Sequence, residues 1–285
     1  MHDLGSGSPS GWGAGGPVIV AVCGKGGAGK TSISAAIVKE LLRDPAHRVL
    51  AIDADPAVGL ASALGVEVTR TVDDIRSDVI RQLESGTRTD RREILAHLDY
   101  QVFEAVRERG NLAFLAIGRP EKQGCYCNVN DFLRDIIGTL VGNFDAVVID
   151  GEAGIEQVNR RVLERVTHLV QVSDGSARGI TVAQAILKVA QAAVAYERTG
   201  LILNRIRGEA EARTLAVPDE LNYLGWVPED DAVRRSGMQG TSLLDLPPGP
   251  FLEAVRACLA RVGIPAAWIR LATTRAPGAH RDAPP

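Results

Sequence analysis

Residues 23–32 read CGKGGAGKTS, and this stretch decides the fold. It contains the pattern G-x-x-x-x-G-K-[ST], after the aliphatic run VIVAVC (18–23) and before a helical stretch. In that position the backbone N–H groups of the turn can surround phosphate groups, which the positive end of the helix also attracts. The sequence therefore predicts a nucleoside-triphosphate site in which Lys30 reaches the β- and γ-phosphates and Thr31 ligates Mg²⁺. The residues predicted to line this site are Gly24, Gly26, Gly27, Ala28, Gly29, Lys30, Thr31 and Ser32.

Short aliphatic and β-branched runs alternate with helical stretches along most of the chain. The runs lie at 18–23, 48–53, 112–117, 145–150, 168–173, 201–206 and 221–227. Helices are expected near 30–43, 72–85, 91–109, 130–141, 155–165, 177–197, 229–237 and 250–262. Nearly continuous Val, Ile and Leu indicate burial on both faces of a strand, so the alternation predicts an α/β fold with a doubly wound, mostly parallel sheet. Ligands of such folds bind beyond the carboxyl ends of the strands.

The boundaries of the folded part follow from composition. One domain is expected over residues 17–263, and the charged segment 69–110 is interpreted as a helical insertion into it. The leader 1–16 is rich in Gly and Ser and is expected to be flexible. The tail 272–285 is polar and rich in Pro, and is expected to be disordered.

Charge and composition argue against several classes of partner. The formal net charge is −3 and aromatic residues make up 4% of the chain, which favours neither a nucleic-acid surface nor a polybasic membrane patch. No apolar run approaches the ~18 residues of a membrane span. The N-terminal residues lack the basic start and apolar stretch of a signal peptide, so the four cysteines are expected to be reduced. We expect a cytoplasmic protein that binds neither nucleic acid nor membranes.

A second lysine in the glycine-rich turn identifies a narrower group of proteins. The chain has five lysines, and two of them, Lys25 and Lys30, lie in the stretch KGGAGKT. With this stretch the chain resembles the MinD/ParA/nitrogenase-iron-protein class of P-loop ATPases, which carry a deviant Walker A motif. The resemblance covers roughly residues 17–263 and implies that Lys25 crosses the interface of a homodimer to the partner's nucleotide. Dimerisation would then be a condition of ATP hydrolysis, with Lys25, Lys30 and Asp55 as catalytic residues.

Two further stretches match the switch regions of this class. The first, AIDADPAVGL (51–60), places Asp53 and Asp55 after a strand, and the second, VVIDGEAGIE (147–156), contains Asp150 and Gly154. The resemblance implies that Asp55 orients the attacking water and that Asp53 supports the Mg²⁺ shell. It also implies that Asp150 holds Mg²⁺ through water and that Gly154 responds to the γ-phosphate. The alternative for the aspartates is helix capping or turn formation after a strand.

The base side of the nucleotide is expected near the end of the chain. LILNRIR (201–207) places Asn204 at a strand end, where this class reads the base with an amide. The segment 224–240 resembles the base-side loop of the class, with Pro228 and Glu229 near adenine. Residues 204–207 read N-R-I-R and lack the aspartate with which an N-K-x-D motif binds guanine. The predicted nucleotide is therefore ATP rather than GTP. An asparagine at a strand end can also be only a turn residue.

The stretch GCYC (124–127) suggests a metal site. In an extended segment Cys125 and Cys127 point to the same side, whereas on a helix they would be about 200° apart. The following Asn128-Val129-Asn130-Asp131 is typical of a helix cap, so a helix is expected to begin just afterwards. Two thiolates are half of a tetrahedral soft-metal site, and the two-fold axis of a homodimer would supply the other half. The predicted ion is Ni²⁺ or Zn²⁺. Partly buried structural thiols or a redox pair remain alternatives.

The other two cysteines, Cys23 and Cys258, lie in an apolar strand and an amphipathic helix and are interpreted as core residues.

The C-x-C after the third strand, followed by a helix and the D-x-x-A-G-I-E switch, resembles the CooC family of nickel-insertion ATPases. The resemblance implies a metallochaperone whose client is a carbon monoxide dehydrogenase-type metalloenzyme. Two alternatives stay open. One is an iron–sulfur cluster carrier or reductive activator, and the other is a regulatory or spatial-organisation ATPase in which the thiols are incidental.

Overall fold

The computed structural model describes residues 16–84, 97–119, 127–151 and 162–264. Within these ranges the chain forms an eight-stranded sheet with the order β3-β4-β2-β5-β1-β6-β7-β8. Every neighbouring pair is parallel except β3 and β4, which are antiparallel. The strands are β1 (Val18–Gly24), β2 (Val49–Asp53), β3 (Arg107–Arg109), β4 (Leu112–Ala116), β5 (Ala146–Asp150), β6 (Arg165–Ser173), β7 (Ala195–Ile206) and β8 (Tyr223–Pro228). The predicted doubly wound, mostly parallel α/β fold is confirmed.

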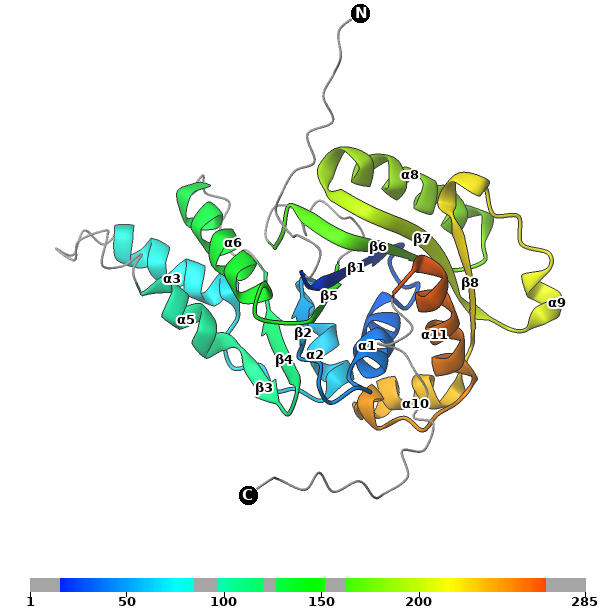
Figure 1. The fold of residues 1–285 in the computed structure, drawn as a ribbon, viewed down its shortest axis with the longest axis horizontal. Helices are drawn as coiled ribbons and strands as arrows, with labels where there is room; N and C mark the ends of the chain where they lie inside the picture. Colours follow the sequence, from blue (N-terminus) through cyan, green and yellow to red (C-terminus); the bar gives the residue numbers. More distant parts are fainter. Residues whose placement is uncertain (1–15, 85–96, 120–126, 152–161, 265–285) are drawn as a thin grey trace, which may run out of the picture.

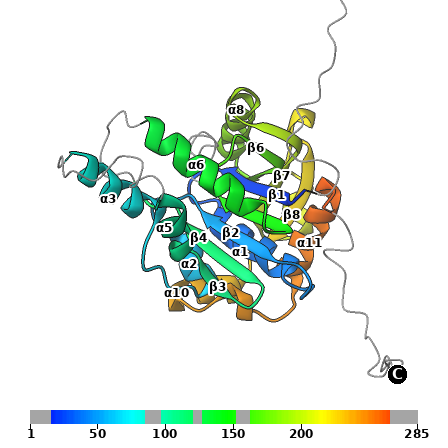
Figure 2. The ribbon, with the colours of Figure 1, turned by 60° about the vertical axis from the view of Figure 1, so that its left-hand side comes forward.

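Helices cover both faces of this sheet (Figure 1). They are α1 (Lys30–Leu41), α2 (Gly59–Leu64), α3 (Val72–Glu84), α5 (Leu98–Ala105), α6 (Cys127–Val141), α8 (Ala177–Ala193), α9 (Glu209–Ala212), α10 (Asp231–Gln239) and α11 (Pro250–Val262). Two short 3₁₀ helices, η1 (Asp219–Leu221) and η2 (Leu243–Asp245), lie in the connections. Figure 2 shows α3, α5 and α6 together on one side of the sheet.

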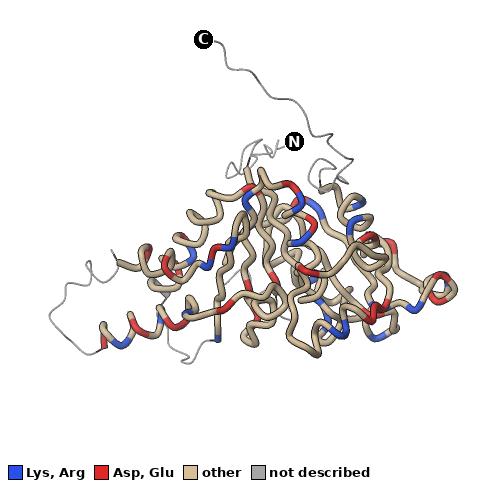
Figure 3. Tube along the Cα trace, turned by 90° about the horizontal axis from the view of Figure 1, so that it is seen from below, with Lys and Arg blue, Asp and Glu red and all other residues tan. Residues whose placement is uncertain are grey.

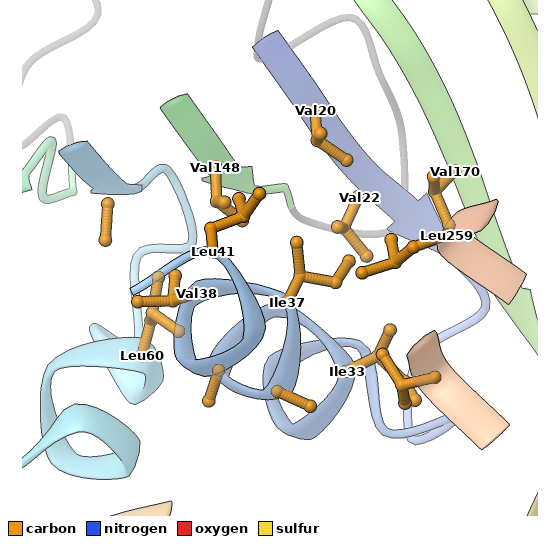
Figure 4. Packing of buried hydrophobic residues seen from close by; sticks show 14 of the residues in the cluster. Val20, Val22, Ile33, Ile37, Val38, Leu41, Leu60, Val148, Val170 and Leu259 are labelled. Carbon is orange, nitrogen blue, oxygen red and sulfur yellow. The ribbon is translucent and has the colours of Figure 1, made fainter. Parts of the chain in front are cut away.

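The core has two principal layers because the central strands are buried on both faces. Along β1, the side chains of Ile19, Ala21 and Cys23 join a cluster with α3, α5, α6 and α8. Val20 and Val22 alternate with them and join the opposite cluster with α1, α2 and α11. Figure 4 shows the second layer, in which the helix α1 turns one apolar face toward the strands. This packing fixes α1, and with it the turn that precedes α1, against the carboxyl end of β1.

Helix α1 is also joined to α11 by a buried ion pair. Glu40 is fully buried, and its two carboxylate oxygens accept hydrogen bonds from Nε and Nη2 of Arg256, at 2.7 and 3.1 Å. Because a bidentate pair of this kind fixes both partners, it orients the two helices relative to each other. The predicted phosphate-binding turn therefore stands on a helix that is held by apolar packing and by this pair.

Several element boundaries differ from the expected ones. The helix expected over 177–197 ends at Ala193, because residues 195–196 pair with residues 165–166 and lengthen both β6 and β7. The helix expected over 91–109 contains α5 and then β3, which pairs antiparallel with β4 at the sheet edge. Helix α6 begins at Cys127, three residues before the expected start at 130. Long-range strand pairing thus overrides the local helical pattern at β3 and at the start of β7.

Candidate phosphate-binding site

The turn between β1 and α1 depends on glycine at two positions. Gly24 has φ +144°, and a Cβ atom there would lie 2.0 Å from the carbonyl oxygen of Val172 on β6. Gly29 has φ +88°, and a Cβ atom there would lie 2.4 Å from the side-chain amide nitrogen of Asn204. Residues with a Cβ are therefore excluded by sterics as well as by backbone conformation. The turn can pass this close to β6 and β7 only with glycine.

The first turn of α1 is arranged to receive an anion. Gly29 is the N-cap residue in the left-handed conformation, and among the described residues no side chain caps this end of the helix. The backbone N–H groups of the first turn and the helix dipole are thus available to a phosphate group. Lys30 follows directly and is only 9% exposed. The predicted phosphate-binding residues are brought together in one turn.

The hydroxyl groups of α1 meet the carboxylate at the end of β5. Thr31 donates a hydrogen bond to Oδ2 of Asp150 and Ser34 donates one to Oδ1, both at 2.8 Å. Ser34 lies three residues after Thr31 and therefore on the same face of the helix. Sequence reasoning paired Thr31 with Asp150 but missed Ser34, which the spacing of three residues could have indicated.

The first switch stretch forms a tight loop organised by Asp53. Its Oδ1 accepts a hydrogen bond from the backbone N–H of Asp55 at 3.1 Å, and its Oδ2 accepts one from Leu60 at 2.8 Å. Asp53 is fully buried and lies opposite Asp150 in the register of β2 and β5. Asp55 is half-buried and its Oδ1 accepts a hydrogen bond from Ala57 at 2.9 Å. These two hydrogen bonds to backbone N–H groups are the turn and capping contacts given above as the alternative role of the aspartates. They also fix the loop that carries Asp55.

The two buried carboxyl groups have unusual affinities for protons. Burial, together with the neighbouring carboxylate of Asp150, raises the pKa of Asp53 to about 7. Burial raises the pKa of Asp150 to about 6, although the hydrogen bonds from Thr31 and Ser34 act in the opposite direction. A cation that offsets the charge of adjacent buried carboxylates favours their ionised forms. Mg²⁺ is commonly held by one or two carboxylates and the phosphates of a nucleotide, so this donor set fits Mg²⁺.

Lys25, the second lysine of the turn, is turned toward β6. Its Nζ atom lies 2.7 Å from Oδ2 of Asp174, the residue after that strand. Asp174 is in turn held by Ser176, whose hydroxyl and backbone N–H both donate to Oδ1. The side chains of Lys25 and Asp174 are 28% and 38% exposed, so the ion pair stabilises this arrangement only weakly. Nothing in the sequence indicated Asp174, which is 149 residues away from Lys25.

A cavity of about 380 Å³ lies beside the turn, where the base was expected. The residues that line it are Ser32, Asn204, Arg205, Pro228, Glu229, Asp230, Val233, Arg234, Gly237, Met238 and Phe251. All three predicted base-side residues are therefore at one cavity. The side-chain amide of Asn204 donates to the carbonyl oxygen of Ala28 at 2.9 Å, so this donor contacts the turn itself. Arg205, which sequence reasoning did not single out, donates to the carbonyl oxygen of Gly27 at 2.9 Å.

The predicted cysteine pair lies mostly outside the described residues. Cys125 falls in the part that the structure does not describe, as does Gly154 of the second switch, and Cys127 is placed only as the first residue of α6. Cys23 and Cys258 are buried as predicted, and burial raises the pKa of their thiols to about 12 and about 11. Within the described ranges, no three His, Cys, Asp or Glu side chains gather in a way that could hold a metal ion.

The described part of the chain contains no helix that is both long and apolar enough to span a membrane. Basic and acidic residues are interspersed over the same part, as Figure 3 shows along the Cα trace.

Comparisons with known proteins match this geometry. The model of the CobQ/CobB/MinD/ParA nucleotide binding domain matches residues 19–243. An uncharacterised ATP-binding protein of Methanocaldococcus jannaschii is 35% identical over 233 residues, which cover 81% of this chain and 92% of the relative. The carbon monoxide dehydrogenase accessory protein CooC of Rhodospirillum rubrum is 29% identical over 257 residues, with 86% of this chain and 97% of CooC covered.

A solved structure shares the fold. It is the septum site-determining protein MinD of Pyrococcus horikoshii in complex with Mg-ADP, which superposes with a TM-score of 0.57 at 22% identity and covers 84% of this chain and 95% of MinD. The family match spans the phosphate-binding turn, both aspartate-bearing strands and every residue that lines the base-side cavity except Phe251. This chain therefore belongs to the CobQ/CobB/MinD/ParA family of nucleotide-binding domains and is a P-loop ATPase of the MinD/ParA class.

Proposed function

We propose that this ATPase is a dimeric metallochaperone, which couples ATP hydrolysis to the insertion of nickel into a carbon monoxide dehydrogenase-type metalloenzyme. The observation that carries the proposal is the pair of cysteines in the sequence GCYC (124–127), in a chain similar to CooC over 86% of its length.

The phosphate-binding turn and the aspartates perform the chemistry in this proposal. Lys30 and the N–H groups of α1 bind the phosphates, and Thr31 and Asp150 hold Mg²⁺ with support from Asp53. The ion neutralises charge on the phosphates when it is bound. Asp55, carried on the loop that Asp53 fixes, orients the water that attacks the γ-phosphate.

Dimerisation supplies the remaining catalytic group. In the single chain Lys25 is paired with Asp174 rather than with the buried carboxylates of its own site. This weak, partly exposed pair can open when a partner's nucleotide offers a stronger anion. We propose that Lys25 then contacts the nucleotide of the partner subunit, so that hydrolysis requires the homodimer. The cytoplasm, where thiols stay reduced, is the compartment that this chemistry needs.

The metal site would be completed by the same dimer. Four thiolates, Cys125 and Cys127 of each protomer, form a closed tetrahedral site that suits Zn²⁺ and accepts Ni²⁺. Closing the dimer on ATP brings the two halves together, so hydrolysis can control capture and release of the cargo ion. The coupling is reciprocal, and metal must favour dimerisation as much as dimerisation favours metal.

The first prediction concerns the amount of bound metal. Protein purified without oxygen and loaded with a non-hydrolysable ATP analogue is expected to hold one Ni²⁺ or Zn²⁺ ion per dimer, measured by elemental analysis and size-exclusion chromatography. The double variant Cys125→Ser, Cys127→Ser is expected to lose both the ion and the metal-induced dimer, while its affinity for ADP stays unchanged. The matched control is Cys258→Ala, because Cys258 is buried and its thiol keeps its proton at neutral pH.

Other outcomes would identify the alternatives. A stoichiometry of one ion per monomer, or metal retained in the double serine variant, would contradict the shared site. A brown protein that absorbs near 400 nm would indicate an iron–sulfur carrier or reductive activator. Unchanged metal content and dimerisation in the double variant would indicate a regulatory ATPase whose thiols are incidental.

A further inference from the structure

Arg205, at the end of β7, has an unusual backbone conformation. Its φ angle is +63°, and among the described residues other than glycine only Val58 and Asn222 share a positive φ. This conformation is costly for a long side chain, and it persists only where surrounding structure compensates for it. The register of β7 against β8 shifts between Asn204 and Ile206, as in a β-bulge. Bulges beside binding sites commonly redirect a side chain.

The redirected side chain reaches the phosphate-binding turn. Nη1 of Arg205 donates to the carbonyl oxygen of Gly27 at 2.9 Å, and the side-chain amide of Asn204 donates to Ala28 at the same distance. Two consecutive residues of β7 therefore hold two consecutive peptide groups of the turn. Arg205 is exposed and also lines the base-side cavity, so its guanidinium lies where a nucleotide would enter.

Planarity of the peptide group links these contacts to the geometry of the turn. In a trans peptide the N–H points opposite to the C=O, so fixing one fixes the other. The N–H of Ala28, in the peptide whose carbonyl Arg205 holds, donates to the carbonyl oxygen of Lys25 at 3.2 Å. The peptide group between Gly27 and Ala28 thus makes a hydrogen bond through its C=O and another through its N–H. The second of these bonds closes the turn from Lys25 to Ala28. Asn204 likewise fixes the N–H of Gly29, which must point away from β7.

We propose that Arg205 is a positioning residue of the nucleotide site. It holds the turn from Lys25 to Ala28 in the conformation that binds phosphate, and its charge favours the anionic ligand. The inference rests on the proposed role of this turn as the phosphate site. A residue that served only the fold would stabilise the protein without nucleotide, whereas the left-handed conformation of Arg205 opposes folding. The conformation is retained because it aims the guanidinium at Gly27.

The test replaces the side chain and leaves the backbone conformation accessible. Asparagine adopts positive φ more readily than most residues but is too short to reach Gly27. Arg205→Asn is expected to raise the Kd for Mg-ADP about tenfold, because a hydrogen bond from a charged group typically contributes that much. Its Tm without nucleotide should stay within about 2 °C of the wild type, so the stabilisation by Mg-ADP shrinks. Arg207→Asn is the matched control, since Arg207 is an exposed arginine two residues further on.

Three results decide the question. An unchanged Kd in Arg205→Asn would overturn the proposal, and so would a large fall of the Tm without nucleotide, which would assign the arginine to the fold. If Arg205→Asn does not fold, Arg205→Gly gives the same comparison with no side chain.

Lys30→Ala, measured in parallel, separates the role of Arg205 from the proposed phosphate site on which it rests. Normal ADP binding by Lys30→Ala would refute the phosphate site itself, whereas loss of binding there and not in Arg205→Asn would refute only the role of Arg205.

Discussion

Asp55→Asn is expected to lower the rate of ATP hydrolysis roughly a thousandfold or more, because a group that orients the attacking nucleophile typically lowers the barrier by several kcal/mol. The amide keeps an oxygen that can accept the hydrogen bond from Ala57, so the loop should keep its shape. Asp53, which organises that loop through Asp55 and Leu60, is unchanged in this variant. ATP should still bind, and the protein should accumulate as an ATP-bound dimer.

The measurement is single-turnover hydrolysis combined with size-exclusion chromatography in ATP. Asp135→Asn makes the same chemical change at an exposed position of α6 and should hydrolyse ATP at the wild-type rate. If Asp55→Asn also hydrolyses ATP at nearly the wild-type rate, another residue orients the water, and the role taken from the first switch is wrong.

Lys25→Ala is expected to abolish hydrolysis and to leave binding of ADP largely intact. The reason is geometric, because Lys25 is paired with Asp174, just after β6, in the single chain, whereas Lys30 is buried at the start of α1. Lys30→Ala should instead weaken nucleotide binding itself, since it removes the charge that lies next to the phosphates. Kd values for ADP and rates of ATP hydrolysis, measured for both variants, test this division.

Two controls sharpen the comparison of the lysines. Lys188→Ala removes an exposed lysine from α8 and should change neither quantity. Mixing Lys25→Ala with Lys30→Ala should restore part of the activity, because a mixed dimer joins a bound nucleotide to an intact Lys25 of the other subunit. Equal loss of ADP affinity in both single variants, or no restoration on mixing, would contradict the transfer of Lys25 across the interface.

The sequence predicted those parts of the site that depend on local pattern. The glycines, Lys30 and Thr31 follow from one motif. Asp53 and Asp150 follow from the resemblance to the two switch stretches, and the structure places them in register at the ends of β2 and β5. Ser34 was not predicted, because serine is common in helices. Its spacing of three residues from Thr31 nevertheless places it on the helix face that contacts Asp150.

Contacts over long distances in the chain could not be predicted in this way. Asp174 meets Lys25 only because β6 lies next to β1 in the sheet, and strand order is a property of the whole fold. Arg205 is directed toward the turn by a bulge against β8. An arginine in the sequence does not indicate a positive φ, so this conformation could not be predicted. The start of β7 within an expected helix has the same origin, since pairing with β6 decides it.

The buried carboxyl groups of Asp53 and Asp150 lower the stability of the protein without nucleotide as the pH rises from acid to neutral. Their pKa values of about 7 and about 6 lie above the ordinary value of 3.8. As the pH rises from the ordinary value toward these values, the unfolded chain has already released protons that the folded chain retains, so the free energy of unfolding falls. Above both values the two carboxylates repel each other inside the fold, and the accumulated loss is on the order of a few kcal/mol.

A bound cation reverses this effect, since it replaces the protons that the carboxyl groups release. We therefore expect the Tm without nucleotide to fall between about pH 4 and about pH 7, the interval between the ordinary and the raised pKa values, and the increase caused by Mg-ADP to be larger at the higher pH. Thermal unfolding across this range checks the expectation, and a Tm without nucleotide that rises with pH would contradict it. Binding should also release protons, which calorimetry in buffers of different ionisation enthalpy can count. The empty site thus lowers the free energy of unfolding at neutral pH, and binding of the nucleotide with Mg²⁺ is expected to restore it. In this sense the ligand would stabilise the fold as well as serve the reaction.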